Sequence, residues 1–327
     1  MAVLSVLLPF RDAAATIREA LASVLCEREV PLEVIAVDDG SEDEGARVVE
    51  GFGDARVRLL RTEGIGVARA TALAANAARF SLLARMDADD VSLPGRFAAQ
   101  VAALRDERLS VVGTLVEAFG EVGEGARLYV EWLNGIVTPE DHAREIFVES
   151  PLCQPSVAIR RAALEAVGGY RESVGPEDYD LWLRLHAAGH RLAKVPQPYL
   201  RWRHHARRAT HVDPRCALPQ FALQKAPFLA ARLRDSGRDV VVWGAGKTGR
   251  RLARALEAHG VFPSAFVDID PRKIGGVARG VPIIDPAMLD ARAVVVVAVG
   301  ARGARAIVRG RLRARELVEG VDFVCAS

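Results

Sequence analysis

The stretch that decides the fold is LEVIAVDDGSED, residues 32–43. It begins as a largely apolar run of strand length and ends in two aspartates, a glycine and a serine. Such an apolar run suits a strand that is buried on both faces, and Asp, Gly and Ser favour a turn after it. The stretch therefore predicts an inner strand whose carboxyl end carries acidic side chains.

The same pattern recurs along the first 110 residues. We predict further strands at 3–8, 57–60 and 81–86, separated by helices, and the last strand ends in Asp87-Ala88-Asp89-Asp90. Alternation of buried strands and helices predicts an α/β fold, in which a parallel-rich sheet has helices on both faces. Because such sheets bind ligands beyond the carboxyl ends of their strands, both acidic clusters are candidate site residues.

Helix starts are also predicted from local signals. Thr16 and Ser41 are each followed three residues later by a glutamate, which is the pattern of a capping box, and Ser92 precedes a proline. We expect helices to begin at these three residues. A further amphipathic helix is expected from Glu177 to a stop at Gly189.

A second α/β pattern begins near residue 237. A predicted strand at 239–243 leads into Gly244-x-Gly246-x-x-Gly249 and a helix, and Asp268 ends the following strand. In this context the glycines can bring backbone close to a phosphate at a helix N-terminus, as in dinucleotide-binding folds. The segment suffices for about one mononucleotide-binding half. We therefore expect a docking or regulatory role, with NAD(P) binding at Gly244, Gly246, Gly249 and Asp268 as the weaker alternative.

These patterns divide the chain into three parts. We predict a first α/β domain at 1–211, a linker or helical connector at 212–236, and a small Rossmann-like domain at 237–327. The chain of 327 residues is long enough for about two domains.

Composition excludes several classes of protein. The 44 Lys+Arg and 42 Asp+Glu leave a net charge of +2, so no overall basic field points to nucleic acid. The four cysteines form no C-x-x-C pair, which argues against a disulfide framework or structural zinc and fits a reducing cytoplasm. The apolar run at 3–10 is too short for a membrane span and is not preceded by the basic segment of a signal peptide.

Each motif has an ordinary structural interpretation beside a functional one. Asp87-Ala88-Asp89 is a solvated turn or a divalent-cation site, and Asp38-Asp39 is a turn or a nucleoside contact. Glu177-Asp178 is a helix cap or holds a general base. His204-His205 belongs to a basic connector or contacts a metal or a diphosphate. Taken singly, none of these motifs decides between its two interpretations.

Taken together, the motifs resemble glycosyltransferase family 2, the inverting nucleotide-sugar transferases with a GT-A fold. The resemblance covers about residues 1–210. It is carried by six segments in the order and spacing of the family: VLLPFRDAAATIREALASVL, VIAVDDGSEDEG, GIGVARATALAANAA, ARMDADDVSLPGRF, GGYRESVGPEDYDLWLRL and YLRWRHH. Two departures are Phe10-Arg11-Asp12, which replaces a more polar opening, and Thr62, where an asparagine is common.

The resemblance implies a nucleotide-sugar donor site at the carboxyl end of the sheet. Pro9 and Asp39 would line the nucleoside pocket, with Asp38 as a second candidate there. Arg69 lies in the helix that often helps to hold the donor. Asp87 would contribute to the donor site as the first carboxylate of the D-x-D motif.

The resemblance also implies the catalytic groups. Asp89, with Asp87, would hold Mn²⁺ or Mg²⁺, and His204 or His205 would add a metal or diphosphate contact. Asp178, or in its place Glu177, would deprotonate the acceptor hydroxyl.

The implied function is metal-dependent, inverting transfer of a sugar from a nucleotide-sugar, expected to be a UDP-sugar. The acceptor would be a hydroxyl of a cell-surface glycan or of a lipid-linked precursor. The enzyme would then be cytoplasmic, with peripheral contact at the inner face of the membrane. Two alternatives remain: an NAD(P)-dependent oxidoreductase that uses the C-terminal glycine-rich loop, and a catalytically idle sugar-nucleotide binding protein.

Overall fold

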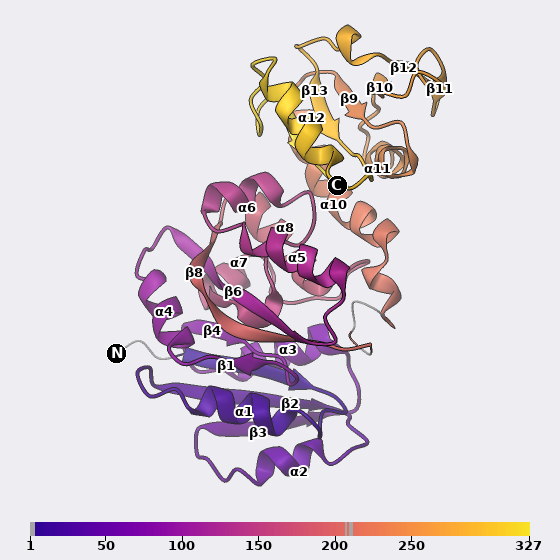
Figure 1. Ribbon diagram of the computed structural model, residues 1–327. Helices are drawn as coiled ribbons and strands as arrows, with labels where there is room; N and C mark the ends of the chain where they lie inside the picture. Colours follow the sequence, from indigo (N-terminus) through magenta and orange to yellow (C-terminus); the bar gives the residue numbers. More distant parts are fainter. Residues whose placement is uncertain (1–3, 207, 209–211) are drawn as a thin grey trace. The chain divides into compact units, whose positions relative to one another are not determined.

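The computed structural model describes residues 4–206, 208 and 212–327 (Figure 1). The chain forms two compact units, each with its own sheet. The first unit comprises Met1–His142, Pro151–Glu172 and Arg184–Val212. The second comprises Ala143–Ser150, Ser173–Leu183 and Asp213–Ser327.

The first unit contains an eight-stranded sheet with the order β3-β2-β1-β4-β7-β6-β8-β5. Its strands are β1 (Leu4–Phe10), β2 (Leu32–Asp39), β3 (Val57–Thr62), β4 (Leu82–Arg85), β5 (Val91–Ser92), β6 (Leu109–Gly120), β7 (Ala158–Arg160) and β8 (Arg191–His204). Strands β3, β2, β1 and β4 are parallel, whereas β7 runs antiparallel between β4 and β6. The predicted parallel-rich α/β sheet is confirmed.

Helices follow most of these strands. In the first unit they are α1 (Ile17–Leu25), α2 (Gly45–Glu50), α3 (Val67–Ala77), α4 (Arg96–Ala103), α5 (Glu124–Asn134), α6 (Pro139–Glu145) and α7 (Arg161–Ala166), with the 3₁₀ turn η1 (Gln154–Ser156). Helix α6 ends in the second unit, and α8 (Glu177–Ala187) begins there. The strands β1 and β2 are buried along their whole length, and α3 packs on both. The sheet therefore forms the core of this unit.

The predicted capping residues do not cap. Thr16 precedes α1 but makes no side-chain hydrogen bond to the helix N-terminus. The hydroxyl of Ser41 accepts a hydrogen bond from the backbone of Asp12 at 3.0 Å, and α2 begins four residues later than predicted. Ser92 lies in β5, and α4 begins after Gly95, whose φ is 80°. The helix start at Thr16 is confirmed, since α1 begins at the next residue, but its capping bond is absent. The starts at Ser41 and Ser92 were wrong, because a tertiary partner binds Ser41 and a glycine in the left-handed region precedes α4.

The second unit contains a six-stranded sheet with the order β11-β12-β10-β9-β13-β14. Its elements are α10 (Leu218–Asp235), β9 (Val240–Trp243), α11 (Lys247–Glu257), β10 (Ala265–Val267), β11 (Val277–Ala278), β12 (Val281–Ile284), β13 (Val294–Val297), α12 (Ala304–Arg313) and β14 (Phe323–Cys325), with 3₁₀ turns η2 (Pro214–Cys216) and η3 (Pro286–Met288). All neighbouring strands except β11 and β12 pair in parallel. Strand order reverses at β9, as in Rossmann-like sheets.

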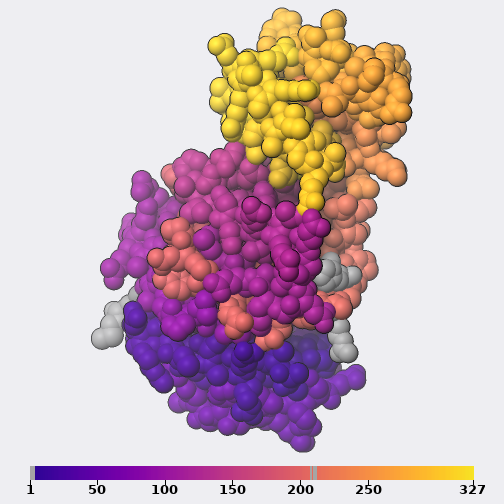
Figure 2. All heavy atoms as spheres, viewed as in Figure 1, coloured from indigo at the N-terminus to yellow at the C-terminus, as the bar shows by residue number. Residues whose placement is uncertain are grey.

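The space-filling view shows the yellow atoms of α12 and β14 gathered beside the orange atoms of the preceding strands (Figure 2). The second unit also includes two segments from the middle of the chain, 143–150 and 173–183. The boundaries placed at 211 and 236 by the sequence stay predictions.

Among the helices of the described ranges, none combines the length and apolar character required to cross a bilayer.

Candidate functional site

An acidic cluster lies directly after β4, one strand away from the point where the strand order reverses at β1. It consists of Asp87, Asp89 and Asp90, and one carboxylate oxygen of each lies within 4.8 Å of the others. Parallel strands bind ligands at this edge of a sheet. The structure thus brings together the two predicted D-x-D carboxylates and adds a third.

Two of the carboxylates have cationic or titratable partners. Asp87 forms an ion pair with Arg85 at 2.7 Å, and the side chain of Arg85 is almost fully buried. Asp89 lies 3.0 Å from the Nε2 atom of His205. Both carboxylates are half-buried, so they remain accessible to a ligand while held in place.

Asp90 is the member of the cluster that sequence reasoning missed as a site residue. It is only 1% exposed, and its Oδ1 accepts a hydrogen bond from the backbone of Arg203 at 2.8 Å. Its Oδ2 is buried without a hydrogen-bond partner among the described residues. A buried carboxylate oxygen without a partner is costly. The third acidic residue after a D-x-D could have signalled this role.

Burial and mutual repulsion raise the pKa values of Asp87 and Asp90. Burial raises the pKa of Asp90 well above its ordinary 3.8, and the charges of Asp87 and Asp89 raise it further. Burial also raises the pKa of Asp87; Arg85 opposes this shift and Asp89 adds to it. A divalent cation would supply the missing partner and offset the repulsion, and hard cations prefer carboxylate oxygens. The residues present therefore fit Mn²⁺ or Mg²⁺.

Buried polar side chains fix the strand end that carries this cluster. Arg96 of α4 is fully buried and donates to the carbonyl of Arg85 at 2.7 Å and to the carbonyl of Pro155. Burial lowers the pKa of Arg96 to about 10. Gln100, one turn later, donates to the carbonyl of Val112 at 2.8 Å. Hydrogen bonds from buried side chains therefore hold the end of β4, which carries the acidic cluster.

Asp39, at the end of β2, shapes the loop that follows β3. Its carboxylate accepts hydrogen bonds from the hydroxyl of Thr62 at 2.6 Å and from the backbone of Ile65 and Gly66 at 2.7 and 2.8 Å. Thr62, the departure from the family pattern, is thus a direct partner of Asp39. The nucleoside role of Asp39 stays a prediction.

The other predicted donor residues lie at the same end of the first sheet or on α3. Pro9 is buried in β1, and the carboxylate of Asp38 accepts from the backbone of Ser41 at 3.0 Å. Arg69 forms an ion pair with Glu172 at 3.1 Å, with both side chains more than half exposed. Exposure leaves the Arg69 guanidinium accessible to a phosphate.

The two adjacent histidines differ in their surroundings. His204 is buried, with its ring edge-on to Trp202 at 5.0 Å between centroids and 3.3 Å from the guanidinium of Arg208. His205 is the one that contacts Asp89. The geometry favours His205 as the neighbour of the cluster, and the metal role of His204 stays a prediction.

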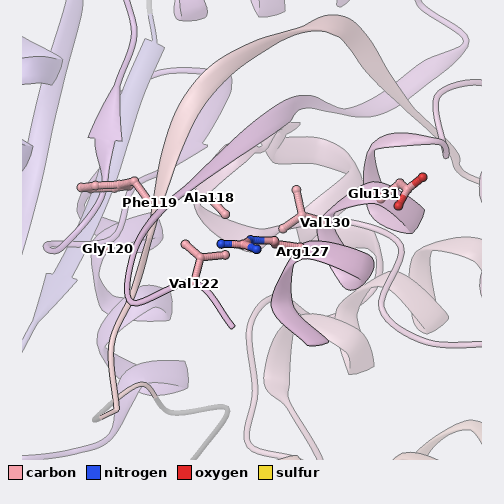
Figure 3. Close-up of a pocket in the computed structure, with 7 residues that line it drawn as sticks. All are labelled: Ala118, Phe119, Gly120, Val122, Arg127, Val130 and Glu131. Atoms are coloured by element: carbon pink, nitrogen blue, oxygen red, sulfur yellow. The ribbon is translucent and has the colours of Figure 1, made fainter. Parts of the chain in front are cut away.

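A hollow of about 490 Å³ opens between the end of β6 and helix α5 (Figure 3). It is lined by Ala118, Phe119, Gly120, Val122, Arg127, Val130 and Glu131. The Arg127 side chain reaches toward Val122 in the close-up (Figure 3). Gly120 pairs with His204 across β6 and β8, so the hollow lies at the strand end that also leads to His205.

The predicted base candidates begin α8, in the part that belongs to the second unit. Glu177 is buried. Asp178 accepts a hydrogen bond from the backbone of Tyr179 at 2.7 Å, and its other oxygen lies 3.5 Å from the hydroxyl of Ser150. Carboxylates are favoured at a helix N-terminus, and Asp178 lies in the first turn of α8.

The glycine-rich loop follows β9 in the second unit. A Cβ at Gly249 would lie 1.8 Å from the carbonyl oxygen of Gly244, so this contact between helix and loop requires glycine. Asp268 accepts hydrogen bonds from the backbone of Ala245 at 3.0 Å and from Lys273 at 2.9 Å. The carboxylate that would bind a ribose is therefore engaged within the protein. Dinucleotide binding at Gly244, Gly246 and Gly249 stays a prediction.

Comparison with known proteins shows the family. Residues 5–168 match the family model described as Glycosyl transferase family 2. The chain is 30% identical over 196 residues to "Putative glycosyltransferase EpsE" of Bacillus subtilis (strain 168), covering 57% of this chain and 68% of that protein. It is 26% identical over 175 residues to the amylovoran biosynthesis glycosyltransferase AmsE of Erwinia amylovora, covering 52% of this chain and 64% of that protein.

A solved structure shows the same fold. The crystal structure of S. aureus TarS residues 1–349 in complex with UDP-GlcNAc superposes with a TM-score of 0.58 at 18% identity, covering 80% of this chain and 74% of that one. The family model, the relatives and the acidic cluster at the sheet edge lead to one conclusion. This chain belongs to glycosyl transferase family 2 and is a glycosyltransferase.

Proposed function

We propose that this enzyme transfers a sugar, with inversion and with the help of a divalent cation, from a UDP-sugar to a hydroxyl of a cell-surface glycan or lipid-linked acceptor. The observation that carries the proposal is the cluster of Asp87, Asp89 and Asp90, with its buried, unpartnered oxygen on Asp90. The relatives AmsE, in amylovoran biosynthesis, and TarS, with UDP-GlcNAc, support the acceptor and donor classes.

In this proposal the acidic cluster holds the cation. A bound Mn²⁺ or Mg²⁺ would act as a Lewis acid that neutralises the diphosphate leaving group. Asp89 and Asp87 offer half-buried oxygens, and Asp90 offers the buried one. Pro9, with Asp38 and Asp39, lines the nucleoside pocket. Arg69 binds a donor phosphate with its exposed guanidinium.

Asp178 is the proposed general base. An acceptor hydroxyl has a high pKa, so a carboxylate must take its proton as the hydroxyl attacks the anomeric carbon. One base and one displacement invert the configuration of that carbon. Glu177 is the alternative base, and its burial makes it the less accessible of the two carboxylates.

The hollow beside α5 is the proposed place for the acceptor. It adjoins His204 through the pairing of Gly120, and His205 next in sequence contacts Asp89. Its walls combine apolar side chains with the guanidinium of Arg127, which suits an acceptor that carries both a sugar and a phosphate. A lipid-linked acceptor would bring the enzyme to the inner face of the membrane.

The test is transfer activity with a panel of UDP-, GDP- and dTDP-sugars, with Mn²⁺ and after its removal by a chelator. We expect turnover of a UDP-sugar only with the cation. Metal-independent turnover would contradict the role of the cluster. Oxidation of NAD(P)H without sugar transfer would instead support the oxidoreductase alternative.

A variant in the hollow tests the acceptor site. Arg127→Gln should raise the KM for the acceptor and leave the affinity for UDP unchanged. Arg105→Gln, on the segment after α4, is a matched surface control. An unchanged acceptor KM in Arg127→Gln would place the acceptor elsewhere.

A further inference from the structure

The turn after α6, residues 146–150, lies against the start of α8 within the second unit. The hydroxyl of Tyr179, which is completely buried, donates to the carbonyl of Ile146 at 2.7 Å. The hydroxyl of Ser150 lies 3.5 Å from the carboxylate of Asp178. The position of Asp178 therefore depends on where this turn is held.

Lys225 of α10 holds the turn from one side. Its Nζ atom donates to the carbonyls of Phe147 at 2.6 Å, Val148 at 2.7 Å and Ala326 at 3.1 Å. The side chain is only 4% exposed. These three acceptors offset the cost of burying an amine. Lys225 thereby joins the turn to the segment that follows β14.

Arg309 of α12 holds the residue that precedes the turn. It donates to the carboxylate of Glu145 at 2.8 Å and to that of Glu319 at 2.9 Å. Both carboxylates are nearly buried, at 5% and 7% side-chain exposure. Arg144 also contacts Glu145 at 3.2 Å and Arg313 contacts Glu319 at 2.8 Å, so Arg309 is the residue that joins the two carboxylates. Its loss would leave each nearly buried carboxylate with one arginine partner fewer, which is costly in such surroundings.

We propose that Lys225 and Arg309 are positioning residues for the base of the transfer reaction. They hold Glu145 and the carbonyls of Phe147 and Val148. The same turn contacts the start of α8, through Ile146 to Tyr179 and through Ser150 to Asp178. A base must be held within about 0.5 Å of its productive position, so small movements of this turn reduce turnover. The proposal rests on Asp178 being the base, as proposed above. It gives the C-terminal sheet a part in catalysis that needs no ligand of its own.

The experiment uses the variants Lys225→Met and Arg309→Met in the full chain. Each should lower kcat about tenfold, as expected for a displaced base, and leave the affinity for UDP within about twofold of the wild type. Arg238→Met, which removes the ion pair with Asp322 in the same unit, is the matched control and should keep kcat.

Two further variants separate positioning from general destabilisation. Arg309→Lys keeps a cation beside Glu145 and should recover most of the lost kcat. Lys225→Met should cause little further loss in an Asp178→Asn background, because a residue that acts through the base has no effect once the base is gone.

Unchanged kcat in folded Lys225→Met and Arg309→Met would overturn the proposal. If Lys225→Met fails to fold, the comparison of Arg309→Met with Arg309→Lys decides in its place. Full activity of Asp178→Asn would contradict both the role of Asp178 as the base and the positioning role of Lys225 and Arg309. An inactive Asp178→Asn beside a fully active Arg309→Met would leave the proposed function standing and overturn the positioning role alone.

Discussion

Both sheets carry aspartates directly after a parallel strand, but the hydrogen-bond partners of these aspartates differ. At the edge of the first sheet, Asp87, Asp89 and Asp90 crowd within 4.8 Å, and one buried oxygen of Asp90 has no partner among the described residues. At the edge of the second sheet, Asp268 stands with donors on three sides, from Ala245, Asp270 and Lys273. The same residue type after a parallel strand thus serves two different purposes.

The pKa shifts express this difference. Burial raises the pKa of Asp90 and neighbouring carboxylates add to it. Burial also acts to raise the pKa of Asp268, but hydrogen bonds from Lys273 and the backbone hold it below its ordinary value. A carboxylate that is stabilised by its own protein supports the fold, whereas one that is not is available to a cation.

The largest loss of activity is expected at the proposed general base, which lies outside the acidic cluster. Asp178→Asn should lower kcat about 1,000-fold, within the range of general-base catalysis, and leave the affinity for UDP and Mn²⁺ intact. Steady-state kinetics with calorimetry of donor binding is the measurement, and Asp235→Asn at the end of α10 is a control. Equal losses of donor affinity and rate would make Asp178 a structural cap.

Asp89→Asn tests the acidic edge directly. Turnover should fall about 100-fold and the Mn²⁺ requirement should weaken, because a neutral amide replaces a charged ligand. Titration of activity with Mn²⁺ measures both. Asp106→Asn, in an exposed pair with Arg108, is the matched control. A near wild-type rate at low Mn²⁺ would show that Asp89 is not a ligand.

Asp268→Asn tests the opposite edge. It should destabilise the second unit by about 1–3 kcal/mol, because an amide nitrogen would face donors that now bind a carboxylate. Thermal or urea unfolding measures the loss, with Asp285→Asn at the exposed turn η3 as the control. A gain in stability would mean that Asp268, like Asp90, is not stabilised by its partners within the protein.

Asp90→Asn should have the smallest effect, and of the opposite sign. Because the pKa of Asp90 is raised in the folded state, that state binds more protons than the unfolded chain above pH 3.8, so stability falls as pH rises through this window up to the folded pKa. Removing the charge should raise the Tm of the metal-free protein by a few degrees at neutral pH. The gain over the wild type should shrink at low pH and on addition of Mn²⁺. A lower Tm without metal would show that Asp90 is satisfied in the folded protein.

The sequence predicted which strands end in acidic residues, but not which hydrogen bonds those residues form. Asp87 and Asp89 were identified because a strand pattern followed by acidic residues is visible within a few positions. Asp90 was not singled out, because the backbone N–H that binds its carboxylate belongs to Arg203 on β8, 113 residues away. The capping residue Ser41 was misjudged for the same reason, since its partner Asp12 lies on another loop.

The sequence by itself determined the alternation of strands and helices, the acidic ends of the strands and the glycine-rich loop of the second unit. These features depend on residue periods and turn preferences that act over a few positions. The tertiary structure alone decided which histidine contacts Asp89, 116 residues away, and that Arg309 binds Glu145 across 164 residues. Such pairs depend on how sheets and helices pack, and packing brings together side chains whose separation along the chain carries no local signal.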